Sequence, residues 1–482
     1  MHSHEAMSED GGRAYSALTI LTRLADRNPR TSGLLRDALR RRLILLLETS
    51  FEVAIETGAP MAIALLEELH NEDSYGSLIR FQVLCDDPRY KNSLFLQQVS
   101  LVATEKLLAR FGSPDRLNEK QLQEYARLAS NLGVRLGAAG RLEEALSRAE
   151  EAVKIERGLA GKNPEGHLPG LADSLNNLGI RLAALGRKEE ACSTFQETVG
   201  LYRGLSEIRP AEILADLAMS LHNLGASLGD LGRLGEALVV LEESIELRKQ
   251  LARSQPATFL ASLASSLNGL GIRLSEASRL EDSLHVTGEA VDLLRELVHF
   301  RPDIYLPALA RSLVNQGLNF GESGRLEDAL VHLEEAVRIY RDLTQSRPET
   351  ILPHLALALA NLGGRLFDLQ RSEDALCVTK EAVGIYRSLA RTSPEGYIPD
   401  LAGSLSNLGQ ILLDLGEPGE ALSVAEEALR IVAPFFLGLP AGWIAWMAPI
   451  AMSYLDLMEK AGKEPDTPLL SAILDALQSR KS

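Results

Sequence analysis

The sequence predicts an all-α protein, a right-handed α-solenoid of two-helix units that repeat every 46 residues, with helical caps at both ends. Leu, Ala, Glu and Arg are abundant, and all four are good helix formers. Aromatic residues make up only 5% of the chain, which disfavours an all-β fold because strands are rich in them. Three kinds of residue also recur with one long period, which is typical of solenoids.

The period is visible in glycine, proline and small residues. The glycines are Gly133, Gly179, Gly225, Gly271, Gly317, Gly363 and Gly409. The prolines are Pro164, Pro210, Pro256, Pro302, Pro348, Pro394 and Pro440. The small residues are Ala145, Ala191, Ala237, Ser283, Ala329, Ala375 and Ala421. Three series in one register over roughly 300 residues predict one repeated structural unit.

Each unit is expected to hold two helices. In the second unit an apolar stripe at helical spacing marks the first helix: Leu175, Leu178, Leu182 and Leu185. Gly186 should end that helix, because glycine accepts the left-handed conformation after a helix. The second helix should begin near Arg187. Proline is tolerated in a first helical turn, so we expect the first helices to begin near these prolines: Pro169, Pro307, Pro353 and Pro399.

A family resemblance rests on these residues. Leu178-Gly179-x-x-Leu182, then Ala191-x-x-x-Phe195, then a closing proline, resembles the tetratricopeptide pattern. That family repeats every 34 or so residues, so the unit here is about 12 residues longer. It resembles the long tetratricopeptide units of kinesin light chains and of bacterial and fungal sensor proteins. The resemblance covers about residues 120–440 and implies an α-solenoid.

The domain organisation follows from where the period holds. Residues 120–440 are expected to form seven repeats. Residues 1–119 show helical patterns without the period and are predicted to form a helical N-terminal cap of degenerate repeats. Residues 441–482 are predicted to form C-terminal capping helices, which a solenoid needs to cover its last apolar face. The uncharged stretch 431–452 is interrupted by three prolines, so we interpret it as a turn between helices and not as a membrane span.

Charge and motifs narrow the function. The chain has 50 basic and 66 acidic residues, a net charge of −16, which disfavours nucleic acid as a partner. Three cysteines and no secretory signal favour a cytoplasmic protein. No phosphate-binding loop, nucleophile elbow or metal-ligand spacing is present. We therefore expect neither an enzyme nor a bound metal or cofactor.

Two polar series mark the first helices. The asparagines are Asn131, Asn177, Asn223, Asn315, Asn361 and Asn407, and Gly269 interrupts them. The arginines, four residues further on, are Arg135, Arg181, Arg273 and Arg365. Spacing of i, i+4 places both on one side of the helix. Amides could pair with a peptide main chain and arginines could attract carboxylates, or both could bridge adjacent units. Both interpretations stay open at this point.

A second arginine series follows each turn: Arg141, Arg187, Arg233, Arg279, Arg325 and Arg371. We interpret it as structural, with each arginine paired to a carboxylate of the next helix. In one unit Gly269 interrupts the asparagine series, Ser278 replaces the turn glycine and Ser283 replaces the small alanine. These exceptions predict that residues 264–300 are the weak point of the array.

The leading functional hypothesis is a non-catalytic scaffold that binds a protein or an extended peptide on the concave face of the solenoid. The alternative is a regulatory sensor or adaptor that controls a separate protease or NTPase effector in trans. Neither membrane nor nucleic acid is expected as a partner.

Overall fold

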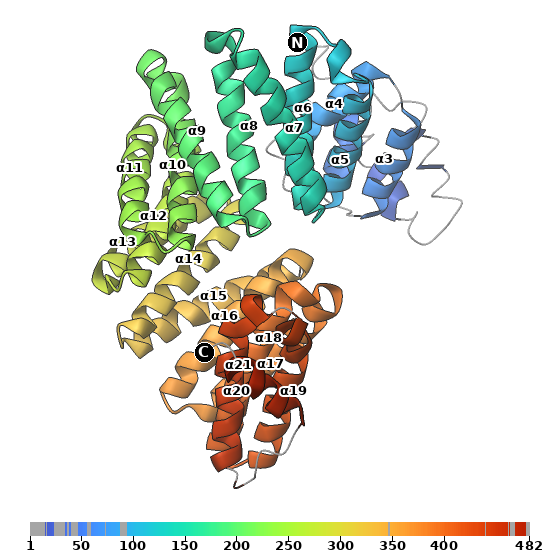
Figure 1. Cartoon of the computed structure of the whole chain (residues 1–482). Helices are drawn as coiled ribbons and strands as arrows, with labels where there is room; N and C mark the ends of the chain where they lie inside the picture. The colour runs from blue at the N-terminus through green and yellow to red at the C-terminus, as the bar shows by residue number, and fades with distance from the viewer. Residues whose placement is uncertain are drawn as a thin grey trace. The chain divides into compact units, whose positions relative to one another are not determined.

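A computed structural model shows a helical chain (Figure 1). The structure describes residues 15, 17–23, 34–35, 38–39, 47–54, 59–72, 74–86, 94–345, 348–438, 440–460, 462 and 468–478. Within these residues every regular element is a helix and none is a strand. Residues 1–14 of the predicted N-terminal cap lie outside the described residues.

The described part of the predicted N-terminal cap contains three labelled α-helices and a short 3-10 turn. These are α3 (Ala59–Asn71), α4 (Tyr75–Asp86), α5 (Leu94–Ala109) and η1 (Pro114–Arg116). Phe51 and Phe81 are fully buried and lie 6.1 Å apart between ring centroids. The Lys106 ammonium of α5 donates to the carbonyl oxygens of Leu69 and His70, at 3.0 and 2.7 Å. It therefore caps the C-terminus of α3, where a cation is favoured.

Two-helix units follow. We call the first helix of each unit the A helix and the second the B helix. The A helices are α6 (Glu119–Ala138), α8 (Pro164–Ala184), α10 (Pro210–Asp230), α12 (Pro256–Glu276), α14 (Pro302–Glu322), α16 (Pro348–Asp368) and α18 (Pro394–Asp414). The B helices are α7 (Leu142–Ala160), α9 (Lys188–Ile208), α11 (Leu234–Ser254), α13 (Leu280–Phe300), α15 (Leu326–Thr344), α17 (Ser372–Thr392) and α19 (Pro418–Gly438). Two further helices are α20 (Pro440–Lys460) and α21 (Pro468–Gln478).

The chain forms two compact parts, Met1–Val240 and Leu241–Ser482. In the first part, each helix from α6 to α10 packs on the next (Figure 1). In the second part the same holds from α12 to α20. Each helix buries its apolar stripe against its chain neighbours, so the predicted all-α solenoid of two-helix units is confirmed. The division into an N-terminal cap, seven repeats and a C-terminal cap stays a prediction.

The turn from A helix to B helix has one geometry. Gly186 has φ 73°, and the Arg187 N–H donates to the Leu182 carbonyl at 3.0 Å. This is the left-handed cap that the glycine predicts. Ser278 and Gln370 occupy the same position in two other units, both at φ 60°. The turn therefore forms without glycine there, although an L-residue in this conformation costs about 1–2 kcal/mol.

The repeat glycine sits inside the A helix and allows the B helix to approach. A Cβ at Gly179 would lie 2.6 Å from the Phe195 ring, and one at Gly317 would lie 2.8 Å from Leu333 Cγ. Real Cβ atoms do not come this close to a neighbour, so a larger residue would push the two helices apart. The glycine that recurs in each unit therefore allows the close spacing of its A and B helices.

The prediction for the start of the A helices is wrong by more than one turn. The helices begin at the closing prolines, for example Pro164, and Pro169, Pro307, Pro353 and Pro399 lie inside them. Proline at the first position loses no hydrogen bond, which makes Pro164 the better start. Pro169 removes one hydrogen bond, to the Glu165 carbonyl, close to the helix end. The proline that seems to close one unit is thus the first residue of the next.

The uncharged stretch 431–452 belongs to the end of α19 and the start of α20, with Pro434 and Pro449 inside these helices. The described part of this stretch is thus helical and not a turn, and residue 439, between the two helices, lies outside the described residues. Among the described residues, no helix is long and apolar enough to cross a membrane.

The turn arginines pair as predicted, each with a carboxylate three residues on. Arg187 contacts Glu190 at 2.6 Å, and Arg371 contacts Asp374 at 2.7 Å. A second set of ion pairs joins successive B helices with a spacing of 40 residues: Arg157–Glu197, Lys249–Glu289, Arg295–Glu335, Arg341–Glu381 and Arg387–Glu427. Most of these side chains are exposed, so each pair contributes about 1 kcal/mol or less.

Candidate functional site

The asparagine series lies along the A helices, and two of its members bridge adjacent units. The Asn177 amide on α8 donates to Ser130 Oγ on α6, at 2.9 Å. The Asn223 amide on α10 donates to Asn176 Oδ1 on α8, at 3.0 Å. Both bonds reach 47 residues back along the chain. For these two residues the structure supports the bridging interpretation.

The other asparagines make no such hydrogen bond among the described residues, although Asn268 stands 47 residues before Asn315. The position 47 residues before Asn361 is Val314, and the position before Asn407 is Ala360. Neither side chain has a polar atom, so the bridge cannot form there. The amides of Asn131, Asn315, Asn361 and Asn407 make no hydrogen bond to a described residue. Asn361 is half-buried and Asn407 is exposed.

The arginine series packs against neighbouring elements. Arg181 lies over Gly137 of the preceding A helix, and Arg365 lies over Gly321, where a Cβ would be 2.8 Å from Arg365 Cδ. Arg273 pairs with Glu276 at 2.9 Å and Arg135 reaches the Ser100 carbonyl at 3.4 Å. Burial lowers the pKa of Arg181. Arg135, Arg181 and Arg365 thus contact a neighbouring helix, whereas Arg273 pairs within its own helix; ligand contact by the arginines stays a prediction.

One irregularity in the series has a structural reason. Asn319 stands where four of the other units have arginine, and Ser283 stands where all the other units have alanine. The Asn319 amide donates to Ser283 Oγ at 2.7 Å, and Ser283 Oγ donates to the Gly271 carbonyl at 2.7 Å. The two exceptions therefore form one buried network. Ser283 therefore gives no reason for weakness in residues 264–300, and Gly269 and Ser278 still support that prediction.

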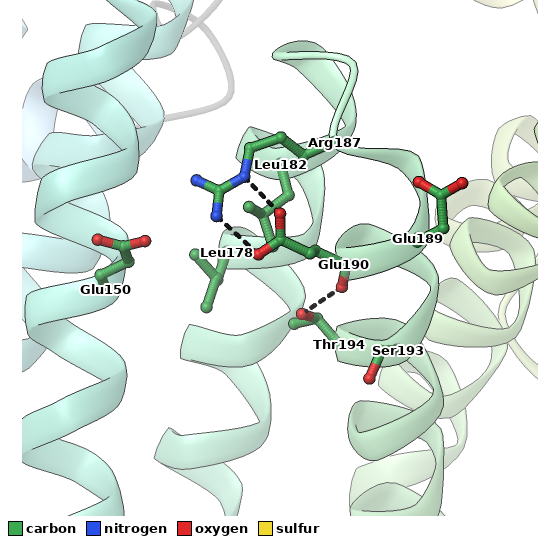
Figure 2. A pocket seen from close by; sticks show the side chains of 8 residues that line it. All are labelled: Glu150, Leu178, Leu182, Arg187, Glu189, Glu190, Ser193 and Thr194. Carbon is green, nitrogen blue, oxygen red and sulfur yellow. Dashed lines mark hydrogen bonds and ion pairs between the residues drawn. The ribbon is translucent and has the colours of Figure 1, made fainter.

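A recess of about 400 Å³ opens between α7, α8 and α9 (Figure 2). Arg187 and Glu190 are joined there, and the Thr194 hydroxyl donates to the Glu190 carbonyl at 2.7 Å. Figure 2 shows Glu150 on α7 opposite this pair. Three glutamates and one arginine line the recess, so its charge is negative and its arginine is already paired. We assign no ligand to it.

A third polar series joins the B helices to the A helices that follow them, and the sequence pattern predicts only packing for its tyrosines. Tyr202, Tyr340 and Tyr386 keep the 46-residue period on B helices and are buried. Fourteen residues after each tyrosine, on the next A helix, stand Asp216, His354 and Asp400. The Tyr340 and His354 rings stack at 5.8 Å, and Asp400 raises the pKa of Tyr386 further after burial has raised it. The signal was present as a spacing of 14 residues between two helices, which no single-helix pattern shows.

Among the described residues, no group of three or more histidine, cysteine, aspartate or glutamate side chains is placed to hold a metal ion.

The family model for the tetratricopeptide repeat matches residues 126–165, 171–206, 217–252 and 401–432. These four stretches of the chain are therefore tetratricopeptide repeats. The family resemblance predicted from sequence is thus confirmed, and the 46-residue tetratricopeptide unit owes its length to A and B helices of about 21 residues. A search of curated proteins finds no match.

Solved structures resemble the chain only at low identity. One is a Rap protein complexed with competence and sporulation factor, 16% identical over 80% of this chain and 99% of that one, with a TM-score of 0.46. Another is BtubC (BKLC) from P. vanneervenii, 17% identical over 52% and 92%, with a TM-score of 0.42. A third, kinesin-light-chain-like repeats from Podosopora anserina, is 18% identical over 47% and 100%, with a TM-score of 0.39. At these scores the likeness carries no functional argument.

Proposed function

We propose that this tetratricopeptide repeat chain is a non-catalytic scaffold that binds a protein or extended peptide along its A helices. The observation that supports this is the contrast within the asparagine series. Asn177 and Asn223 are used inside the fold, whereas Asn315, Asn361 and Asn407 make no hydrogen bond to a described residue. An amide offers both a donor and an acceptor, so such a row suits a peptide main chain of any sequence.

The experiment compares an amide of each kind. The full chain is screened against an array of extended peptides, and the affinity of the best peptide is measured for Asn361→Ala and Asn177→Ala. Asn361→Ala should weaken binding about fivefold, the equivalent of about 1 kcal/mol for one hydrogen bond, and leave the melting temperature unchanged. Asn177→Ala should lower the melting temperature, because it breaks a bond between units.

Two results would contradict the proposal. One is an array on which no peptide binds above background. The other is a pair of variants in which Asn361→Ala loses stability and keeps full affinity. The regulatory adaptor remains the second candidate, because the same face would serve it; it requires a separate effector whose activity changes when this chain is added. Cytoplasmic location remains a prediction.

A further inference from the structure

The second part of the chain contains a cavity of about 330 Å³ lined by residues of α14 and α16 and by Tyr340 of the B helix α15. Its lining is Ile304, Pro307, Ala308, Arg311, Tyr340, Thr350, Ile351 and His354. Arg311 lies one helical turn before Asn315 on α14, so the cavity opens on the face to which we assign peptide binding. The inference below rests on that proposed function and names the chemistry of one subsite.

We call a buried B-helix tyrosine, together with the polar residue of the A helix before it and that of the A helix after it, a tyrosine node. The node at Tyr340 has a counterpart three units earlier, in which the residue on the preceding A helix has the opposite charge. Residues 138 positions apart, three periods of 46, are equivalent: Tyr202 corresponds to Tyr340, Asp173 to Arg311 and Asp216 to His354. In the earlier node the Tyr202 hydroxyl donates to Asp173 Oδ1. That tyrosine therefore has a carboxylate from its own unit. In the later node the carboxylate position holds a guanidinium, and the space beside it is open.

The groups in the cavity are donors. Arg311 is exposed and makes no hydrogen bond or ion pair with a described residue, although the chain is strongly acidic. Burial raises the pKa of Tyr340 to about 12, so its hydroxyl stays protonated and can donate. Burial and the nearby Arg311 lower the pKa of His354, so at neutral pH one ring nitrogen carries a proton to donate. A guanidinium and two neutral donors are the groups that an oxyanion requires.

We propose that the cavity between α14 and α16 binds an oxyanion carried by the partner peptide, with Arg311 as its charged contact and Tyr340 and His354 as its hydrogen-bond donors. The peptide's carboxylate or phosphate takes the place that Asp173 fills in the earlier node. A peptide bound in an extended conformation along the A helices would place its main chain on Asn315 and one acidic group in the cavity.

The cavity is tested first with small anions, acetate and inorganic phosphate, on the full chain. The His354 ring resonances are followed by NMR, assigned by their loss in His354→Gln, with chloride at equal ionic strength as the blank. Arg311→Gln removes the charge, and Arg338→Gln is the matched control, because Arg338 is an exposed arginine of α15 outside the cavity lining. We expect saturable shifts in the wild type and in Arg338→Gln, and at least tenfold weaker binding in Arg311→Gln.

Peptides then identify the source of the anion. A peptide from the array is prepared with Glu, phosphoserine or Gln at one position. We expect the wild type to prefer the Glu or the phosphoserine peptide over the Gln peptide, and Arg311→Gln to abolish this preference. No saturable shift with either anion, or equal anion affinity in Arg311→Gln and the wild type, would overturn it. Anion binding without any peptide binding would leave the cavity assignment standing and remove the proposed function. Peptide binding indifferent to the acidic group and to Arg311 would do the reverse.

Discussion

Glu156 is a buried acid whose surroundings favour its neutral form. Its side chain is 3% exposed, and its Oε2 makes no hydrogen bond with a described residue. Burial raises its pKa; the nearby His167 opposes this shift and Asp173 adds to it. His167 Nδ1 lies 4.0 Å from Oε2, and its Nε2 lies 3.2 Å from Glu119. A negative charge on Glu156 would lose its hydration without gaining a hydrogen bond for Oε2, so the charged form is disfavoured here.

The sign of the resulting pH dependence follows from linkage. Because the folded state holds the Glu156 proton more tightly than the unfolded state does, this group stabilises the fold fully only below the ordinary pKa of glutamate. That stabilisation is lost as the pH rises through the folded-state pKa. Glu156→Gln should therefore raise the melting temperature at pH 7.5, with a gain that shrinks as the pH is lowered towards about 4.3. Glu150→Gln, exposed on the same helix, should change nothing; a gain for Glu156→Gln that is equal at every pH would contradict the argument.

At the scale of the element, sequence alone could predict what depends on spacing along one helix. The apolar stripe, the turn glycine and the period each follow from one helix or one turn. The helix start at Pro164 could not be chosen over Pro169, because both prolines suit a first turn and only the packed neighbours decide. Ser283 and Asn319 lie on different helices and are 36 residues apart in the sequence. Each of these two residues therefore appears from the sequence alone as an unrelated exception.

Adjacent glycines of α16 allow a sharp test of the contact between A and B helices. A Cβ at Gly363 would overlap the buried Thr379 hydroxyl of α17, whereas a Cβ at Gly364 would meet nothing within 4 Å. Gly364→Ala should stabilise the protein by about 1 kcal/mol through helix propensity. Gly363→Ala gains the same propensity but must displace Thr379, so we expect a net loss of roughly 1–2 kcal/mol. Chemical denaturation of both variants measures the difference. Equal effects would mean that the glycine period does not set the helix spacing.

At the scale of the whole chain, the tetratricopeptide architecture was predictable and the candidate site was not. Periodicity identifies which residues occupy equivalent positions in the repeats, but not which of them have a hydrogen-bond partner in the fold. Asn177 and Asn361 look alike in the sequence and differ because Ser130 lies opposite one and Val314 stands at the corresponding place opposite the other. The charge reversal from Asp173 to Arg311 likewise gains meaning only beside the buried tyrosines. The repeat determines where the helices and their equivalent residues lie. The residues that depart from the repeat determine the binding specificity that we propose.

A chain whose helices pack on their chain neighbours should also respond locally to damage. In such an array stability is approximately a sum over units and their nearest-neighbour interfaces. Gly363→Ala should therefore lower hydrogen-exchange protection in α16 and α17 and, less strongly, in α15 and α18, while α6 and α7 keep their wild-type protection. Exchange measured by mass spectrometry on the full chain, with Gly364→Ala as the control, gives the profile. The same wild-type profile tests whether residues 264–300, with Ser278 in the left-handed turn position, exchange faster than their neighbours. A uniform loss of protection from α6 to α20 in Gly363→Ala would show that the chain unfolds as one cooperative body, and the nearest-neighbour description would then fail.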